Sequence, residues 1–351
     1  MPRAWWLRLT GMVLAAICAG CSSAVRTDSH PPVADGAYDS EFPTTPVSAD
    51  LQQIAESVRM VTAIAYYRSL TFSAEARVTE ADFRNGFVTE RVQKVVFMTR
   101  TSSGTAVTIL ARENRIALLT CDHVVRFPDT VYTHYIDQDR HKTPYLSMAS
   151  IMEREEVYVA GIPGGRHLDI LAADPVEDLA VLGKRYEGDM PPGVPVFQYP
   201  YGHATELKWG SFVYIFGYPS GYRMVTKAIV SSPNRNRKGG FLLDAGFKRG
   251  YSGGAVLAIR DGAPHFELVG LIRLAKGPTE VYLTPIREGE QIDFDPTMPY
   301  RGDVFVDRRS DYDYGVAEAV PAESIVEFLA RHKDELHAEG YDISVNVHPA
   351  Q

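Results

Sequence analysis

The sequence predicts an all-β fold, either a barrel or a sandwich. Short apolar, β-branched runs recur from Val92 onward, and turn signals such as Gly239-Gly240 and Asp261-Gly262 separate them. Helical patterns do not intervene between these runs, which argues against a parallel α/β sheet. The runs cover residues 95–98, 105–109, 116–120, 157–159, 179–182, 212–216, 255–259 and 268–272.

The composition is that of a folded, packed chain. Its 351 residues suffice for two or three domains or for one large double-barrel unit, and 45% of them are hydrophobic. The net charge of −8 would repel phosphate backbones, so we expect no nucleic-acid partner. Of the three cysteines only Cys121 lies beyond the leader, which excludes an internal disulfide framework and a cysteine-based zinc site. Because no His-Glu-x-x-His spacing occurs either, we expect neither a metal nor a cofactor.

Residues 1–20 are predicted to be a secretory signal. Two arginines precede an apolar stretch over residues 9–17, which as a helix would rise only about 14 Å and could not cross a bilayer. The stretch ends in Cys18-Ala-Gly-Cys21, which resembles the lipobox of bacterial lipoproteins, although Cys18 stands where that motif usually has Leu. The resemblance implies a lipid on Cys21 and a membrane-anchored protein of the bacterial cell envelope, facing the periplasm or the cell exterior. A plain cleaved signal is the alternative.

Residues 21–50 are rich in Ser, Thr, Pro, Asp and Gly and are predicted to be a flexible tether. A helix is expected over residues 51–70, because apolar side chains recur there at a spacing of three or four and Asp50 with Gln53 forms a capping pair. We expect its apolar stripe to pack on the main body, and binding of a partner is the alternative. The stripe consists of Leu51, Ile54, Val58, Val61 and Ala65.

A second helix is expected near the C-terminus. Pro321 suits a first helical position, and an apolar stripe follows it. Residues 333–351 would then form a tail that is too short for a PDZ domain. The stripe consists of Ile325, Phe328, Leu329 and Leu336.

Three segments carry residues suited to peptide-bond hydrolysis, which requires an activated nucleophile, a base and donors for the oxyanion. Ser252 lies on a glycine-rich turn, residues 250–254, whose backbone N–H groups could converge on an oxyanion. His123 follows one apolar strand and Asp178 precedes another. Taken singly, each has a plain alternative. The Ser252 segment also fits a hairpin turn or the nucleophile elbow of an α/β-hydrolase. His123 could be a hydrogen-bonded core histidine, and Asp178 could be an acidic residue of an ordinary turn.

Together the three segments resemble the trypsin-like serine peptidases with two β-barrels, most closely the bacterial HtrA-type branch. Residues 119–125, 177–182 and 250–254 are similar to that family's histidine, aspartate and serine motifs, and they follow in the same order. The resemblance implies two six-stranded antiparallel barrels, one over residues 90–205 and one over residues 206–332 that includes the terminal helix.

The same resemblance implies a role for each residue. His123 would act as general base and then as general acid, Asp178 would orient its imidazole, and Ser252 would attack the carbonyl carbon. The N–H groups of Gly250 and Ser252 would form the oxyanion hole. Asp174 is a rival for the acidic role, but the Asp-Leu-Ala-Val-Leu match favours Asp178.

Substrate specificity is implied only in outline. Gly246 would lie at the base of the primary pocket, where it leaves no carboxylate to select a basic side chain, although Asp244 is close by in sequence. Residues Arg273, Leu274 and Ala275 would pair with the substrate backbone by strand addition. We expect a preference for small or medium apolar side chains.

The sequence departs from the family pattern in two places. Tyr251 stands where Asp or Asn is usual, which argues against activation by a new N-terminus and could crowd the oxyanion loop. Residues 126–156 carry additional polar sequence, which is expected to form a surface loop or an added hairpin.

The expected function is that of an envelope-tethered serine endopeptidase that cleaves proteins or peptides through an acyl-enzyme. A catalytically silent, protease-like lipoprotein that binds peptides or an envelope partner is the alternative from another class. An α/β-hydrolase esterase would need His265 or His332 as its base, and the strand-rich pattern disfavours it.

Overall fold

The computed structural model describes residues 34–137, 141–162, 167–188, 190, 192–246, 248–273, 276–284, 305–312 and 315–349. Its helices and strands belong to one compact unit, residues 35–351. The predicted signal and Cys21 lie outside the described residues, as does residue range 22–33 of the predicted tether. No helix within the described ranges has the length and apolar character needed to cross a membrane.

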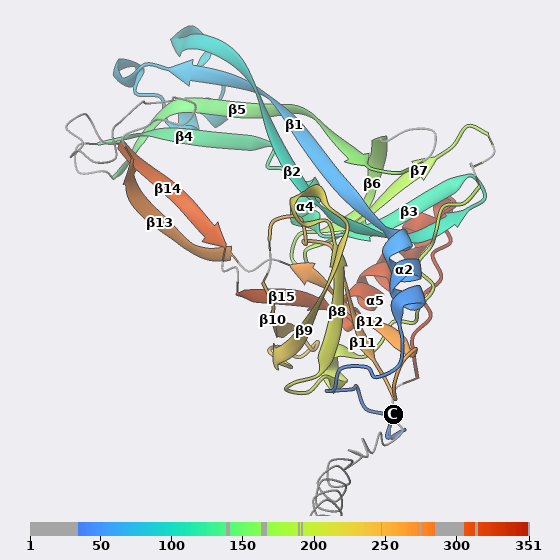
Figure 1. The fold of residues 1–351 in the computed structure, drawn as a ribbon. Coiled ribbons are helices and arrows are strands. Elements are labelled where there is room, and N and C mark those ends of the chain that lie inside the picture. The colour runs from blue at the N-terminus through green and yellow to red at the C-terminus, as the bar shows by residue number, and fades with distance from the viewer. Residues whose placement is uncertain are drawn as a thin grey trace, which may run out of the picture. The chain divides into compact units, whose positions relative to one another are not determined.

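The first barrel is a closed antiparallel sheet of six strands (Figure 1). The strand order around it is β1-β2-β3-β7-β6-β5, and pairing of β1 with β5 closes it. A further strand, β4, pairs with β5. These strands are β1 (Val58–Phe72), β2 (Val92–Arg112), β3 (Arg115–Thr120), β4 (Thr130–Ile136), β5 (Lys142–Val159), β6 (His167–Asp174) and β7 (Leu179–Arg185).

The second barrel also closes with six antiparallel strands, in the order β10-β15-β12-β11-β8-β9. Two closed barrels confirm the predicted all-β class and its double-barrel architecture. Strands β13 (Lys276–Thr284) and β14 (Phe305–Tyr312) pair with each other as a separate two-stranded sheet. The barrel strands are β8 (Phe212–Gly217), β9 (Met224–Ser232), β10 (Phe241–Asp244), β11 (Ala255–Ile259), β12 (Phe266–Arg273) and β15 (Val316–Pro321).

Each barrel encloses an apolar core, and a third apolar cluster joins the two barrels. Along β3, Ile116 and Leu118 face the core of the first barrel, whereas Ala117 and Leu119 belong to the joining cluster. Successive side chains of a strand point to opposite faces, so a strand that is buried on both faces is apolar throughout. Strand β8 divides in the same way, with Val213 and Ile215 in the second core and Phe212, Tyr214 and Phe216 in the joining cluster.

The C-terminal helix is confirmed as α5 (Ala322–Arg331), which packs Ile325, Phe328 and Leu329 into the joining cluster. Pro321 is the residue before the first helical turn rather than its first member. The expected tail begins with a further helix, α6 (Lys333–Ala338), and its later part is held by Tyr201. The Tyr201 N–H donates to Asn346 O at 2.8 Å, and its carbonyl accepts from His348 N at 2.9 Å.

The helix expected over residues 51–70 ends at Ser57. Helix α2 spans Ser48–Ser57, no side chain caps its N-terminus, and Asp50 lies within its first turn instead of before it. From Val58 onward the chain is strand β1, whose buried and half-buried residues alternate. Apolar residues at positions 58, 61 and 65 fit a helical spacing, but hydrogen bonding of β1 to both β2 and β5 determines the conformation. The first barrel therefore begins at residue 58 and not at residue 90.

The additional sequence at residues 126–156 contains the hairpin of β4 and β5. The adjoining halves of β1, β2 and β5 extend beyond the barrel with it and enclose a small apolar cluster of their own (Figure 1). A capping box at Thr79 and Asp82 starts helix α3 (Glu80–Arg84) in the β1–β2 connection, between η1 (Ala74–Ala76) and η2 (Thr89–Arg91). The cluster consists of Leu70, Phe72, Val78, Val88, Leu146 and Ala149.

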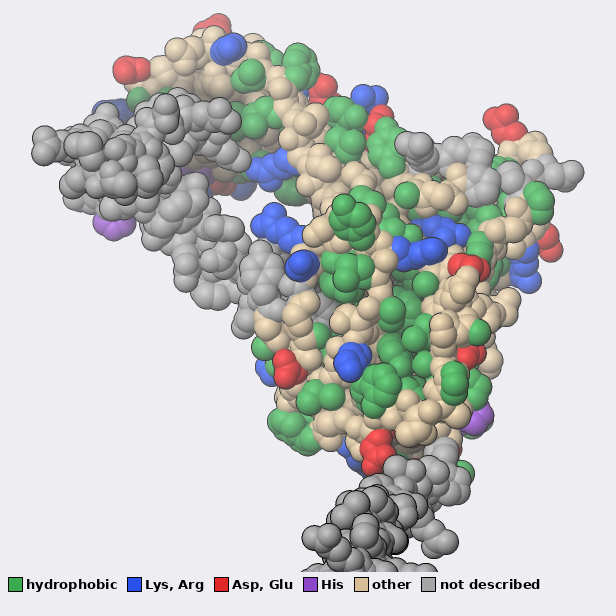
Figure 2. Space-filling view, viewed as in Figure 1, with side chains coloured by type: hydrophobic (Ala, Val, Ile, Leu, Met, Phe, Trp, Pro, Cys, Tyr) green, Lys and Arg blue, Asp and Glu red, His purple; other side chains and the backbone are tan. Residues whose placement is uncertain are grey.

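Strand β9 carries apolar side chains on both faces, with Lys227 between Val225 and Ile229 on the outward one. Ala228 and Val230 point into the second core, whereas Met224, Val225 and Ile229 are exposed. Figure 2 shows hydrophobic side chains gathered over this part of the molecule. The outward face of β9 thus adds to the apolar surface of the second barrel.

Candidate active site

His123 lies on a single helical turn, α4 (Asp122–Val125), at the end of strand β3. Hydrogen bonding of β3 to both β2 and β7 fixes the start of this turn. Val124 and Val125 are buried in the core of the first barrel, whereas the His123 side chain is 42% exposed. Buried neighbours therefore hold the backbone of His123 in place, while its imidazole stays accessible to a substrate.

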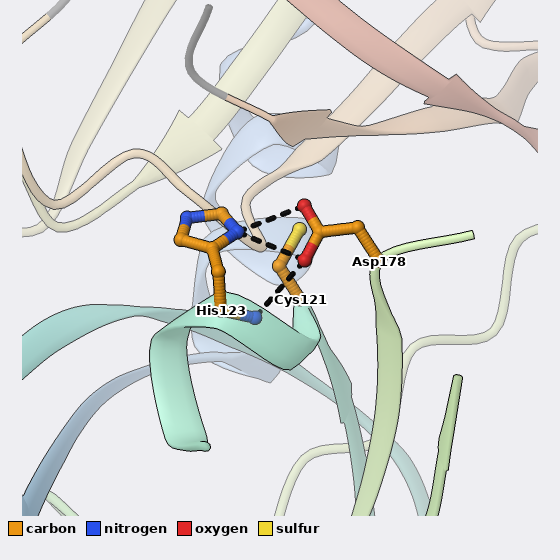
Figure 3. Close-up of side chains that lie close together, drawn as sticks. All are labelled: Cys121, His123 and Asp178. Carbon is orange, nitrogen blue, oxygen red and sulfur yellow. Dashed lines mark hydrogen bonds and ion pairs between the residues drawn. The ribbon is translucent and has the colours of Figure 1, made fainter. Parts of the chain in front are cut away.

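Asp178 holds the imidazole of His123. It lies in the turn between β6 and β7 with a φ of 59°, a left-handed conformation that Asp adopts more readily than most residues. Its Oδ2 lies 2.8 Å and its Oδ1 2.9 Å from His123 Nδ1, and Oδ1 also accepts the His123 backbone N–H at 3.0 Å (Figure 3). This contact favours the proton on Nδ1, which makes Nε2 the hydrogen-bond acceptor of the neutral ring.

Asp174, the alternative candidate for the acidic role, forms hydrogen bonds within the β6–β7 turn. Its Oδ1 accepts the N–H groups of Val176 and Glu177 at 2.9 and 3.0 Å. Its Oδ2 pairs with Arg331 of helix α5. The hydrogen bond from the Glu177 N–H lowers the pKa of Asp174 below its ordinary value. Asp174 thus stabilises the turn that carries Asp178, and in the described part of the chain it forms no hydrogen bond or ion pair with His123.

Ser252 lies on a loop that the first barrel holds in place. The Thr105 N–H of β2 donates to Ser252 O at 2.7 Å, and Thr105 Oγ1 donates to Gly250 O at 2.6 Å. Gly250 has a φ of 108°, and a Cβ there would lie 2.2 Å from Tyr218 O. The loop therefore needs glycine at position 250. Thr105 holds the carbonyls of Gly250 and Ser252 in place.

Two N–H groups of this loop have no acceptor among the residues that the structure describes. Those of Gly253 and Gly254 donate to Ile272 O and Tyr251 O at 2.8 and 2.7 Å. Within the described ranges, neither the Gly250 nor the Ser252 N–H donates a hydrogen bond. These two N–H groups are the ones that the sequence predicts as oxyanion donors, and this role stays a prediction.

The serine loop lies next to the segment that leads into His123. Ile272 O accepts from Gly253 N at 2.8 Å and from Cys121 Sγ at 3.4 Å. No hydrogen bond between His123 and Ser252 occurs among the residues that the structure describes. In substrate-free enzymes such bonds are often long and tighten only when substrate binds. The structure thus joins His123 to Asp178 directly and brings the Ser252 loop alongside.

The ring of Tyr251 is part of the second core. The residue is 2% exposed, and burial raises the pKa of its phenol. Its ring packs over Gly217, where a Cβ would lie only 2.7 Å from Tyr251 Cδ1. A bulky residue is thus accommodated at this position inside the barrel, instead of over the two N–H groups of the loop.

The predicted specificity residues are only partly described. Gly246 is exposed with open space around it, and Arg273 pairs with Glu318 at 2.7 Å across strands β12 and β15. Leu274 and Ala275 lie outside the described residues. Within the described ranges, no hydrogen bond or ion pair joins Gly246 or Arg273 to His123 or Ser252.

Thr105 is the functional position that the sequence pattern does not reveal. It opens an apolar run and is fully buried, yet it hydrogen bonds to three backbone groups around the serine loop. A polar residue at the start of the buried apolar run within β2 is the only local signal of this role.

A family model for the trypsin-like peptidase domain matches residues 104–271. The match includes His123, Asp178 and Ser252 and runs from the end of β2 that holds the serine loop into β12. Residues 104–271 are thus similar to trypsin-like peptidase domains.

Other comparisons add little to this domain assignment. No curated protein matches the chain by sequence. The active form of the Rv3671c protease from M. tuberculosis, a solved structure, is 16% identical, with 90% of this chain and 93% of that chain covered and a TM-score of 0.38. A TM-score of this size carries no argument about the site. The peptidase domain match is therefore the comparison that bears on function.

Proposed function

We propose that the protein is a serine endopeptidase that cleaves peptide bonds through an acyl-enzyme. Ser252 is the nucleophile, His123 the general base and Asp178 the residue that orients and stabilises the imidazole. The observation that carries this proposal is the contact of Asp178 with His123 Nδ1 beside a serine loop with two N–H groups that have no acceptor among the described residues. The peptidase domain match supports the reaction class.

In the first step, Ser252 Oγ forms a bond to the carbonyl carbon while its proton moves to His123 Nε2. Asp178 stabilises the imidazolium that results. The carbonyl oxygen becomes an oxyanion, which the N–H groups of Gly250 and Ser252 receive; one such donor is often worth about 3–4 kcal/mol in the transition state.

The intermediate then breaks its C–N bond. His123 returns the proton to the leaving amine, and the acyl group remains on Ser252 Oγ. Water attacks the acyl carbon while His123 accepts its proton, and release of the acid restores the hydroxyl of Ser252. Every proton in this cycle passes through His123, which requires the Nδ1-bound orientation that Asp178 provides.

The location and the substrate preference are part of the same proposal. A lipid on Cys21 would hold the peptidase at a membrane of the bacterial cell envelope, and the lipobox-like residues before Cys21 support this anchor. The lack of a carboxylate at Gly246 argues against selection of basic side chains, and small or medium apolar side chains are the preference that we propose. The three motifs resemble those of the HtrA-type branch.

A silent, peptide-binding relative is the second candidate. It is favoured by the low exposure of Ser252, which is 4%, together with the lack of a described His123–Ser252 hydrogen bond. In this case the loop would bind a carbonyl oxygen without turnover.

A fluorophosphonate probe separates the two candidates. We expect the full chain to be labelled and the Ser252→Ala variant to stay unlabelled, because the probe reacts only with an activated hydroxyl. Ser103→Ala is a matched control, since Ser103 is an exposed serine of β2, and it should label like the wild type. Labelling of Ser252→Ala would exclude Ser252 as the nucleophile. A folded chain that takes up no probe and leaves casein uncut would establish the silent binder.

A further inference from the structure

The neighbour of the His123–Asp178 pair is a cysteine. Cys121 Sγ, a ring nitrogen of His123 and a carboxylate oxygen of Asp178 all lie within 4.8 Å of one another (Figure 3). Among the described residues, these three are the one group of His, Cys, Asp and Glu side chains placed closely enough to hold a metal ion. We propose that this group binds a divalent transition-metal ion such as Zn²⁺, and that the bound ion switches the proposed peptidase off.

The three side chains supply the ligands that zinc prefers. Thiolate sulfur, imidazole nitrogen and carboxylate oxygen are its usual protein ligands, and a site with three of them leaves the fourth position to water. The thiolate and the carboxylate together carry two negative charges, which balance those of the ion and make a buried site feasible. Cys121 is itself buried, and its present contact is a weak one, from Sγ to Ile272 O at 3.4 Å.

The geometry needs only a small adjustment. With metal–ligand bonds of about 2.0–2.3 Å, tetrahedral ligand atoms lie roughly 3.3–3.8 Å apart. His123 Nδ1 now lies 2.8 Å from Asp178 Oδ2, so the two groups must separate by roughly half an ångström. His123 can move because it lies on a single helical turn and its side chain is 42% exposed. The same exposed side admits the ion and its water.

Occupation of this site is incompatible with the proposed catalysis, and this step rests on the proposed function. Metal coordination at Nδ1 places the remaining proton of the neutral ring on Nε2. Nε2 can then no longer accept the proton of Ser252. Asp178 is also occupied by the ion, and the proton of the Cys121 thiol passes to solvent. The ion would therefore remove the base without touching the nucleophile.

Binding can be tested without any activity, with Co²⁺ as the probe. Titration of the full chain should give a thiolate-to-cobalt charge-transfer absorption that the Cys121→Ala variant lacks. That variant retains Cys18 and Cys21, so it also controls for metal bound by the leader. We expect apparent Co²⁺ affinity to fall on the order of 100-fold or more in Cys121→Ala, because loss of an outer partner alone costs about 10–100-fold.

Two further variants keep this test decisive. His265→Ala removes an exposed histidine remote in sequence and should titrate like the wild type. If Cys121→Ala does not fold, Cys121→Ser replaces it, since a hydroxyl preserves the size of the group but gives no thiolate band. Absence of a thiolate band in the wild type, or an equal band in the cysteine variant, would overturn the site.

Inhibition is measured separately. Zn²⁺ should inhibit peptide cleavage by the wild type, and a chelator should restore the rate. The inhibitory Zn²⁺ concentration should rise on the order of 100-fold in Cys121→Ala. The rate of each protein is compared with its own rate without metal. Equal inhibition of both proteins would refute the switch. Failure of the proposed function is recognised independently, as missing fluorophosphonate labelling in the absence of metal, whereas the cobalt titration does not depend on turnover.

Discussion

Thr105 of the first barrel donates its backbone N–H to the carbonyl of Ser252 in the second, over 2.7 Å. The side chain of Thr105 extends this link, because Oγ1 donates to Gly250 O at 2.6 Å and accepts from Tyr218 N at 2.9 Å. The proposed nucleophile is thus positioned by the barrel that carries His123 and Asp178.

Replacement of Thr105 by Val tests this link. Valine has the shape of threonine but leaves Gly250 O and Tyr218 N without their side-chain partner. Each buried group that loses its hydrogen bond costs about 1–3 kcal/mol of unfolding free energy. We expect the unfolding free energy from urea denaturation to fall by an amount of this order for each of the two groups. We also expect kcat to fall about 10²-fold, because the loop shifts. Thr105→Ser retains the hydroxyl and should recover most of both. A valine variant with wild-type stability and rate would contradict the role of Thr105.

Asp178→Asn should abolish most activity while the protein stays folded. An amide at this position no longer favours the Nδ1–H tautomer of His123, and in a serine peptidase such a change lowers kcat roughly 10⁴-fold. The matched control is Asp174→Asn, since that carboxylate contacts Arg331 and the turn instead of the imidazole. Steady-state cleavage of a peptide should fall for the first variant and change less than about threefold for the second. The reverse pattern would make Asp174 the catalytic acid.

Asp174 also predicts a dependence of stability on pH. The hydrogen bond from Glu177 N is the largest influence on its pKa and lowers it, burial raises it, and the hydrogen bond from Arg331 lowers it again. The net result is a pKa below the ordinary value of 3.8. A carboxyl whose pKa is lower in the folded state stabilises the fold fully above the unfolded value, and this contribution is lost as the pH falls through the folded pKa.

Chemical unfolding of the wild type and Asp174→Asn measures this contribution. The wild type should be more stable by about 1 kcal/mol near neutral pH, and the difference should shrink as the pH drops below 3.8. A difference that stays constant into strong acid would show that Asp174 is not the titrating group.

Gly250 is predicted to tolerate no side chain. With a φ of 108° and Tyr218 O only 2.2 Å from the position of a Cβ, alanine must displace the loop. We expect Gly250→Ala to lower kcat by about 10²–10³-fold, the loss seen when an oxyanion donor is removed. Gly246→Ala is the control for stability, because open space surrounds Gly246 and its unfolding free energy should change by less than about 0.5 kcal/mol. Full activity in Gly250→Ala would remove this N–H from the mechanism.

Most of the strands were predictable because their apolar runs are buried on two faces, although the run over residues 95–98 is largely exposed. Runs such as residues 116–120 and 212–216 therefore show no polar alternation and stand out from their surroundings. Strand β1 was not predictable in this way. Its apolar residues at 58, 61 and 65 satisfy a helical spacing, and only positions 61 and 65 share one face of a strand. Pairing with two other strands selects the extended conformation.

The contact of His123 with Asp178 follows from the motifs only through the family resemblance, since 55 residues separate the two positions. The hydrogen bonds of Thr105 leave one local signal in the sequence, a polar residue in an apolar run, and the approach of Cys121 to the carboxylate leaves none. Both kinds of contact depend on how distant strands are packed.

The division of the proposed machinery between two closed sheets has a practical consequence. Neither half of the domain holds a complete set of reacting groups, so fragments that fold separately should be inert until they associate. The rate of turnover then depends on how well the two halves are aligned. It should decline at denaturant concentrations at which circular dichroism still records intact strands.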